Sequence, residues 1–335
     1  MANGQRVGKY IIHESRGGGR FGEVFRAVDE ALQAERALKI IPISNPQQVV
    51  SKLTEARLLE ACKHKHVVEV KDAGVGVFAG KDSVLIACEL MKCSIQDELE
   101  TAPISLKRAV DAVVEALFGL EYLHDNKVLH CDIKPGNLLV DGKGVVKLSD
   151  FGLAMLIRPG GKPSGIYTAH CSPEMVAGSG ASVATDIYAM GVTLYRLLNN
   201  VTKFVLAPSL SSQISKGLFP DRKGYEACVP DKLRKVCNKA MNIDPGKRYK
   251  SAGEFRQALA KLRWQVDWHQ VTSAVWEGKD NTRSYRIMVS SSSKGWRVDY
   301  YAGRRRRLDH CKDGFSTETE ATDHLLSIVA QTSLH

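Results

Sequence analysis

The hydrophobic pattern of this chain changes its period between residues 90 and 106, and that change limits the fold more than any other feature. Before it, short apolar stretches alternate with Gly and charged residues, as in antiparallel strands. The expected strands are residues 7–13, 23–28, 37–41, 67–73 and 83–89. One stretch, residues 51–61, has a helical pattern instead.

After the change, apolar residues recur every three or four positions, which predicts a long amphipathic helix starting at Leu106. Two further helices are expected at residues 186–198 and 251–262. The first three quarters of the chain therefore predict an α+β, bilobal arrangement. A small β-rich lobe at about 1–89 leads through a junction at about 89–95 to a larger helical lobe at 96–263.

Composition restricts the class of protein. With 335 residues, 44% apolar and 25% charged, the chain is an ordinary globular protein, neither disordered nor collagen-like. The eight Cys have no CxxC or metal-binding spacing, and neither a signal peptide nor a membrane helix is evident, so we expect a cytoplasmic protein without membrane contact. The net charge is +10, of which an excess of nine is dispersed over residues 1–263, and it fits ATP as well as nucleic acid.

A glycine-rich stretch opens the small lobe, with Gly17, Gly19 and Gly22 followed by Val24. Glycine lets backbone N–H groups approach phosphate oxygens without a Cβ in the way. Such turns are common, and a dinucleotide-binding fold would continue into a helix. Here a strand-like sequence follows, which predicts a hairpin lid.

Lys39 lies in an otherwise apolar strand and allows two interpretations. It could extend to water at the end of the strand. Alternatively, it could contact nucleotide phosphates while a carboxylate such as Glu55 holds it. Glu55 itself could equally be a solvated helix residue.

A polar loop between apolar stretches carries Asp132, Lys134 and Asn137, and Asp150 follows thirteen residues later, before a Gly. Asp132 could orient the proton of an attacking hydroxyl, and Lys134 could offset phosphoryl charge. Asn137 and Asp150 offer the oxygen ligands that Mg²⁺ prefers. Two polar turns would explain the Gly and Pro but not this combination.

With these motifs, the chain resembles the eukaryotic-type (Hanks-type) Ser/Thr protein kinases. The matches run in order over about residues 17–250: G-x-G-x-x-G-x-V at 17–24, A-L-K at 37–39, Glu55, H-C-D-I-K-P-G-N at 130–137, D-F-G at 150–152, S-P-E at 172–174 and D-I-Y-A-M-G at 186–191. The resemblance implies a bilobal kinase fold over residues 1–263. It also implies ATP and Mg²⁺ as cofactors, with Mn²⁺ as an alternative metal.

The resemblance also assigns roles to residues. The catalytic group would be Asp132, Lys134, Lys39 and Glu55, with Asn137 and Asp150 as metal ligands. The remaining nucleotide-binding residues would be Gly17, Gly19, Gly22, Val24, Ala37, Glu89, Met91 and Leu139. Asp186 would anchor the catalytic loop, and Glu174 would pair with Arg248.

The chain departs from the family pattern at two places. Cys131 stands where an Arg usually binds an activation-loop phosphate, and a thiol cannot do so. We therefore expect activity without phosphorylation of that loop. The family usually has a Thr seven residues before Glu174. Here Tyr167 stands at that position and Thr168 follows one residue later, which leaves the choice of acceptor open.

Residues 264–335 lie outside the resemblance and predict a small α+β module of three strands followed by a helix, βββα-like. The run Arg304–Arg307 could be a solvated loop or contact nucleic acid. The module could also dock a substrate or inhibit the kinase, and its near-neutral charge favours a protein or intramolecular contact.

The leading interpretation is a Ser/Thr protein kinase that transfers the γ-phosphate of Mg·ATP to protein substrates. Two alternatives stay open. One is a kinase-fold enzyme acting on nucleic acid or a small molecule, and the other is an inactive scaffold that presents the C-terminal module.

Overall fold

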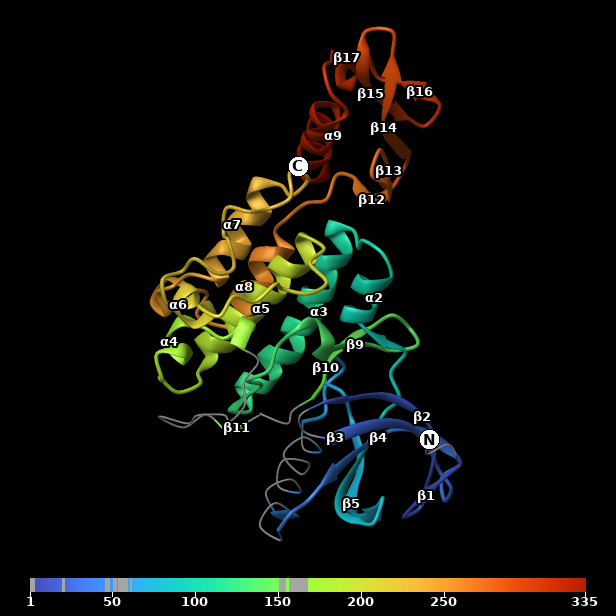
Figure 1. Cartoon of the computed structure of the whole chain (residues 1–335), viewed down its shortest axis with the longest axis vertical. Helices are drawn as coiled ribbons and strands as arrows, with labels where there is room; N and C mark the ends of the chain where they lie inside the picture. Colours follow the sequence, from blue (N-terminus) through green and yellow to red (C-terminus); the bar gives the residue numbers. More distant parts are fainter. Residues whose placement is uncertain are drawn as a thin grey trace.

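Three bodies follow one another along the long axis of the molecule (Figure 1). The computed structural model describes residues 4–19, 22–45, 49–50, 53, 60, 62–150, 155–156 and 168–335. A β-sheet lies at one end, a helical body in the middle and a small α+β module at the other end. The α+β, bilobal fold class is confirmed, and the helix expected at 51–61 lies mostly outside the described residues.

The N-terminal lobe is a six-stranded antiparallel sheet in the order β1-β2-β3-β4-β6-β5. Alternate residues of its strands are buried, as Ile12, Phe25 and Leu38 show, and this gives the period of two that the sequence displays. The strands are β1 (Arg6–Val7), β2 (Tyr10–Gly19), β3 (Gly22–Asp29), β4 (Ala34–Pro42), β5 (Val70–Phe78) and β6 (Lys81–Cys88).

The strand expected at 67–73 was placed too early, because β5 begins only at Val70. The preceding residues turn toward the other lobe. Val67 forms a bridge with Leu148, and the Val68 N–H donates to the Leu148 carbonyl at 2.8 Å. These apolar residues therefore join the lobes instead of lengthening the sheet.

The middle lobe is built around two buried helices, α3 (Leu106–Asp125) and α5 (Val183–Leu198). All residues of α5 from Thr185 to Leu198 are buried, because other elements surround it on every side. The other helices are α2 (Ile95–Thr101), α4 (Pro173–Val176), α6 (Leu210–Ser215), α7 (Asp231–Ala240) and α8 (Ala252–Ala260). Short strands at the boundary with the sheet are β7 (Cys93–Ser94), β8 (Val128–Leu129), β9 (Leu138–Val140), β10 (Val146–Leu148) and β11 (Met155–Leu156).

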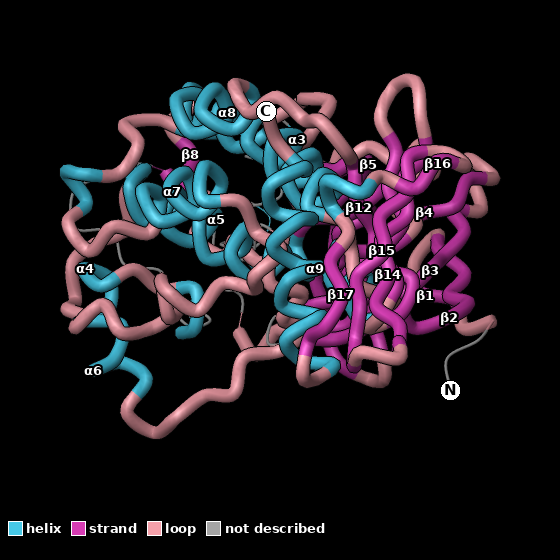
Figure 2. The backbone as a smooth tube through the Cα atoms, turned by 90° about the horizontal axis from the view of Figure 1, so that it is seen from above, coloured by secondary structure: helices cyan, strands magenta, loops and turns pink. Residues whose placement is uncertain are grey.

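The C-terminal module is an antiparallel sheet with one helix along it, as Figure 2 shows from above. The helix is α9 (Glu318–Ser333), and Trp268 donates from Nε1 to Thr332 Oγ1 on it at 3.0 Å. The strands are β12 (Asp267–Thr272), β13 (Val275–Lys279), β14 (Ser284–Ser292), β15 (Gly295–Ala302), β16 (Arg305–Arg306) and β17 (Lys312–Phe315). The expected α+β module is present, but its sheet has six strands where three were expected.

Backbone hydrogen bonds clamp both ends of this module together beside the helical lobe. The N–H of Gln265 donates to the Ser333 carbonyl at 2.9 Å, and that of His335 donates to the Arg263 carbonyl at 3.0 Å. Buried apolar residues run without a break from α8 into the module. In Figure 1 the module lies at the end of the molecule remote from the N-terminal lobe, so it does not cover the boundary between the lobes. Within the described ranges, every helix is too short or too polar to cross a bilayer.

Candidate active site

The glycine-rich stretch forms the hairpin between β2 and β3, as expected. Gly17 and Gly22 both have φ of +126°, a conformation that side chains rarely adopt. A Cβ at Gly22 would lie 2.2 Å from the Ile40 carbonyl oxygen, so only glycine fits beside β4. Gly19 pairs with Gly22 at the end of the hairpin, whose next two residues lie outside the described part.

Lys39 and Asp150 join the two lobes. Lys39 lies on β4, with Val24 opposite on β3 and Ile86 opposite on β6. Its Nζ donates to Asp150 Oδ1 at 2.5 Å, although 111 residues separate the two in sequence. The carboxylate expected beside Lys39, that of Glu55, lies outside the described residues.

Electrostatics keep Asp150 ionised. Burial by itself raises the pKa of this carboxyl, but the ammonium groups of Lys39 and Lys134 outweigh burial and leave the pKa below its usual value. The backbone of Asp150 has φ of +55°, which turns the chain sharply at this point. A charged carboxylate is thus held at the boundary between the lobes.

The polar loop gathers the other three predicted groups. Lys134 Nζ donates to Asp132 Oδ2 at 2.6 Å, and Asn137 Nδ2 donates to the same oxygen at 2.9 Å. Asn137 Nδ2 also donates to the Asp132 carbonyl at 2.7 Å. Because Asn137 donates both hydrogen bonds from its amide nitrogen, its Oδ1 takes no part in the hydrogen bonds with Asp132 and is available to a cation.

Buried Asp186 fixes this loop from beneath, as the resemblance implies. Its carboxylate accepts the backbone N–H groups of His130 and Cys131, both at 2.9 Å. Burial raises the pKa of Asp186, but the hydrogen bonds that its carboxylate accepts, first of all the one from His124, together outweigh burial, and the net pKa lies below the usual value. These two hydrogen bonds hold the backbone of Cys131 at φ of +64°, and this conformation fixes the position of the next residue, Asp132.

Two supporting residues were missed at the sequence level. His124, in the last turn of α3, holds Asp186 through Nε2 at 3.0 Å. Lys147, on β10, holds the Glu89 carboxylate at 2.7 and 2.8 Å. The position of His124 in the last turn of a helix could have marked it as a supporting residue. The sequence offers no such indication for Lys147, because its partner Glu89 lies 58 residues away.

The segment between the lobes contains Glu89 and Met91. The Glu89 N–H donates to the Glu69 carbonyl at 3.1 Å, which fixes the chain as it leaves β6. Met91 is buried, and Leu139 on β9 is half-buried, so both add apolar surface on this side. Val24 and Ala37 are half-buried on the facing strands β3 and β4.

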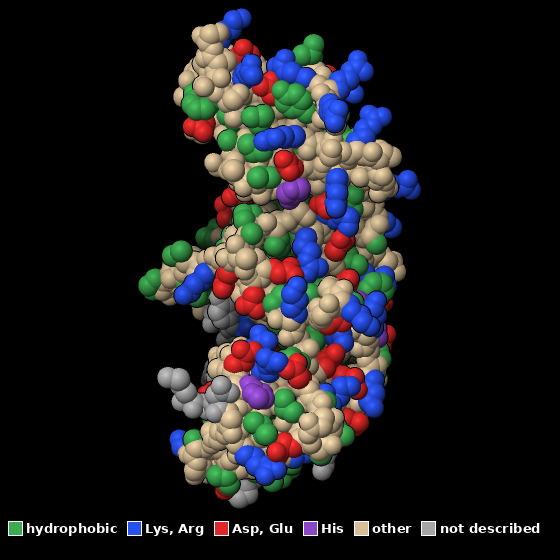
Figure 3. All heavy atoms as spheres, turned by 90° about the vertical axis from the view of Figure 1, so that its right-hand side faces the viewer, with side chains coloured by type: hydrophobic (Ala, Val, Ile, Leu, Met, Phe, Trp, Pro, Cys, Tyr) green, Lys and Arg blue, Asp and Glu red, His purple; other side chains and the backbone are tan. Residues whose placement is uncertain are grey.

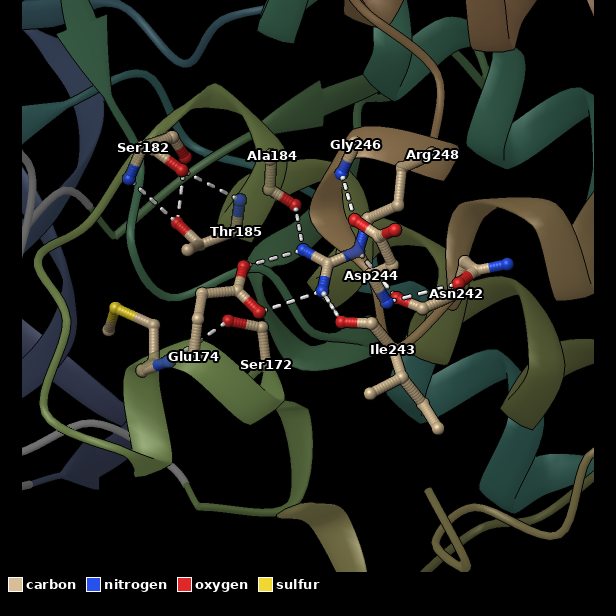
Figure 4. A network of polar contacts seen from close by, with 11 residues as sticks. Ser172, Glu174, Ser182, Ala184, Thr185, Asn242, Ile243, Asp244, Gly246 and Arg248 are labelled. Carbon is tan, nitrogen blue, oxygen red and sulfur yellow. Dashed lines mark hydrogen bonds and ion pairs between the residues drawn. The ribbon is translucent and has the colours of Figure 1, made fainter. Parts of the chain in front are cut away.

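A second buried ion pair fastens the start of α4 to the base of the lobe (Figure 4). Both Nη groups of Arg248 donate to the Glu174 carboxylate, at 2.6 and 2.7 Å. The same guanidinium also donates to the carbonyls of Asn242, Ala184 and Ile243, and its side chain is 0% exposed. The expected pair therefore exists, with every edge of the guanidinium in use.

The donor set fits a divalent cation. Asn137 Oδ1 and the Asp150 carboxylate offer the hard oxygen atoms that such a cation prefers, and Lys39 holds one oxygen of that carboxylate in place. The chemistry that this arrangement supports is transfer of a phosphoryl group, with charge neutralised at its oxygens and a carboxylate for the acceptor hydroxyl.

Residues 10–261 match the family described as "Protein kinase domain". Serine/threonine-protein kinase PrkC of Bacillus subtilis is 30% identical over 279 residues, which cover 80% of this chain and 42% of PrkC.

Two other relatives give the same result. Serine/threonine-protein kinase STK11 of Gallus gallus is 31% identical over 271 residues, covering 75% of this chain and 59% of STK11. Serine/threonine-protein kinase PknB of Mycobacterium tuberculosis is 28% identical over 268 residues, covering 76% of this chain and 43% of PknB. The chain thus spans about half the length of the curated relatives it matches.

Proposed function

The chain belongs to the protein kinase family, and from that premise we propose that it is a Ser/Thr protein kinase using ATP and Mg²⁺, with Mn²⁺ as an alternative metal. The observation that carries the proposal is the Lys39–Asp150 ion pair, which joins strand β4 of one lobe to a carboxylate of the other. The family membership confirms the resemblance seen in the motifs.

The nucleotide is proposed to lie between the lobes. The Gly17–Gly22 hairpin covers its phosphates, and Lys39, held by Glu55, contacts the α- and β-phosphates. The Glu89 carbonyl accepts a hydrogen bond from the adenine, and the Met91 N–H donates one to it. Both groups are available for this, since no other described residue engages them. Val24, Ala37 and Leu139 supply the apolar walls around the base.

The transfer itself depends on position and charge. Asp132 accepts the proton of the acceptor hydroxyl, and Lys134 offsets charge on the phosphoryl oxygens. Asn137 and Asp150 hold the metal ion, which when bound neutralises the phosphate oxygens. Residues 1–263 form the kinase domain of this proposal, and residues 264–335 form an added module. The eight free cysteines support a reducing, cytoplasmic location.

Incubation with γ-labelled ATP and Mg²⁺ tests the function. We expect label on Ser and Thr of a protein acceptor, and a rate about 10²–10⁴-fold lower for Asp132→Asn, because the variant cannot accept the hydroxyl proton. RNA and small-molecule acceptors are run in parallel. Transfer to these alone would contradict a protein substrate, and equal labelling by both forms of the chain would contradict the role of Asp132.

Cys131 carries a separate prediction about activation. Its side chain is buried beside Leu129, and burial raises the pKa of the thiol far above its usual value, so no charge exists there to hold a phosphate. Phosphatase-treated chain is therefore expected to keep its initial rate on a protein acceptor. Loss of turnover after phosphatase treatment, with recovery after autophosphorylation, would show that a phosphate is needed after all.

A further inference from the structure

Basic and acidic residues lie on different elements of the C-terminal module, although its net charge is close to zero. Residues 283–307, on β14, β15 and β16, contain eight Lys or Arg and one acidic residue, Asp299. In contrast, α9 carries three acidic residues and no Lys or Arg. Basic charge therefore gathers on the strands and acidic charge on the helix.

One face of the sheet is left open by the helix. Ile287, Val298 and Tyr300 are buried on the face toward α9, and the alternate residues of the same strands point the other way. The strand register places Arg286, Tyr301 and Arg306 in one row on that open face, with Met288 and Asp299 in the next row. Figure 3 views the side of the molecule away from α9, and Lys and Arg side chains are numerous over its upper part.

The centre of this face is a buried carboxylate between two arginines. Asp299 is 2% exposed although it lies on the open face, because the guanidinium groups close over it. Arg306 Nε donates to Oδ1 at 2.7 Å, and Arg297 Nε lies 2.9 Å from Oδ2. The two arginine side chains themselves are 42% and 43% exposed.

Sharing one carboxylate makes the two guanidinium groups converge. Arg306 contacts Asp299 through Nε and one Nη, whereas Arg297 contacts it through Nε, which also donates to Ser290 Oγ at 3.3 Å. In the described part of the chain, the remaining Nη–H groups of both arginines have no other acceptor. Guanidinium forks held in this way match the several oxygens of a compact anion, and the side-chain entropy cost of binding is already reduced.

The geometry selects a phosphate monoester over a nucleic acid. A phosphodiester chain requires cations spread along a line, each with its own phosphate. Of the eight Lys or Arg on and beside these strands, Arg297 and Arg306 are held around one point by Asp299, which cancels one of their charges. A single dianionic group with three terminal oxygens fits that point better.

We propose that Arg297 and Arg306, oriented by Asp299, bind a phosphorylated Ser or Thr side chain of a peptide. Such a group is the product of the proposed kinase reaction, so the choice of ligand rests on the proposed function. The module then docks substrates that already carry one phosphate and raises their local concentration around the kinase domain for further transfer.

Binding is measured on the full chain by fluorescence anisotropy. The probe is a labelled peptide pool with a central phosphothreonine, and the same pool with Thr is its reference. We expect the phosphorylated pool to bind at least about tenfold more tightly, because charge-assisted hydrogen bonds form only with the phosphate. A labelled single-stranded RNA is titrated in parallel.

The main variant is Arg297→Gln/Asp299→Asn/Arg306→Gln, which removes the forks without leaving a buried charge. It lowers the net charge by one, and Lys294→Gln, in the exposed turn before β15, is the matched control. A second variant, Arg297→Lys/Arg306→Lys, keeps both charges for Asp299 but lacks the forks. Both arginine variants are expected to lose the preference for phosphothreonine, whereas Lys294→Gln keeps it.

Equal binding of the two peptide pools would overturn the proposal, as would a preference that survives in both arginine variants. Tighter binding of RNA, lost in the triple variant, would overturn it in favour of a nucleic-acid surface. The assay needs no catalysis, so phosphopeptide binding without any phosphoryl transfer would count against the proposed function alone. Transfer without the phosphopeptide preference would count against this site alone.

Discussion

Lys39→Met and Asp150→Asn are each expected to lower kcat by about 10²–10³-fold, because each removes a fixed charge that faces the phosphates or their metal. The two side chains contact each other across the lobes. The double variant is therefore expected to lose less than the product of the single losses, as groups that act as a unit do.

Initial rates with labelled ATP and unfolding midpoints are measured for all three variants. Lys107→Met is the control, since Lys107 pairs with Asp111 on the surface of α3 and lies outside the site. Variants that unfold under the assay conditions would show that the pair is structural. Variants with wild-type rates would show that it does not act on the nucleotide.

Arg248→Met is expected to lower the free energy of unfolding by about 3–5 kcal/mol, because it leaves the Glu174 carboxylate without its buried partner. Three backbone carbonyls lose their donor at the same time. The loss would be a large fraction of the stability of an ordinary domain, which is about 5–15 kcal/mol.

Urea unfolding measures this change, again with Lys107→Met as the control. Exposed ion pairs contribute only about 0–1 kcal/mol, so the control is expected to unfold almost as the wild type does. Equal midpoints for Arg248→Met and Lys107→Met would mean that the guanidinium does not clamp α4.

Local sequence patterns predicted the elements that have one clear face. The strands near 23–28, 37–41 and 83–89 and the helix from Leu106 follow from alternation and from the helical period. Three strands were expected in residues 264–335, but the sheet has six. Its short strands show too little alternation to be recognised, as in β13, where only Trp276 and Gly278 are buried.

The partners of the site residues could not be predicted from pattern alone. The motifs named Asp132, Asn137 and Asp150, but the contact of Lys39 with Asp150 depends on the packing of one lobe against the other. The charge count of residues 264–335 was correct and still misleading, since it could not show that Asp299 lies beneath two arginines.

The central claim is that Asn137 and Asp150 hold a metal ion on a nucleotide between the lobes, opposite Asp132. Crystals grown with a non-hydrolysable ATP analogue and Mn²⁺ test it directly, because the anomalous signal locates the metal. The account predicts a peak bonded to Asn137 Oδ1 and to the Asp150 carboxylate, with the phosphates beneath the Gly17–Gly22 hairpin. A metal bound elsewhere, or a nucleotide bound anywhere but between the lobes, would contradict it.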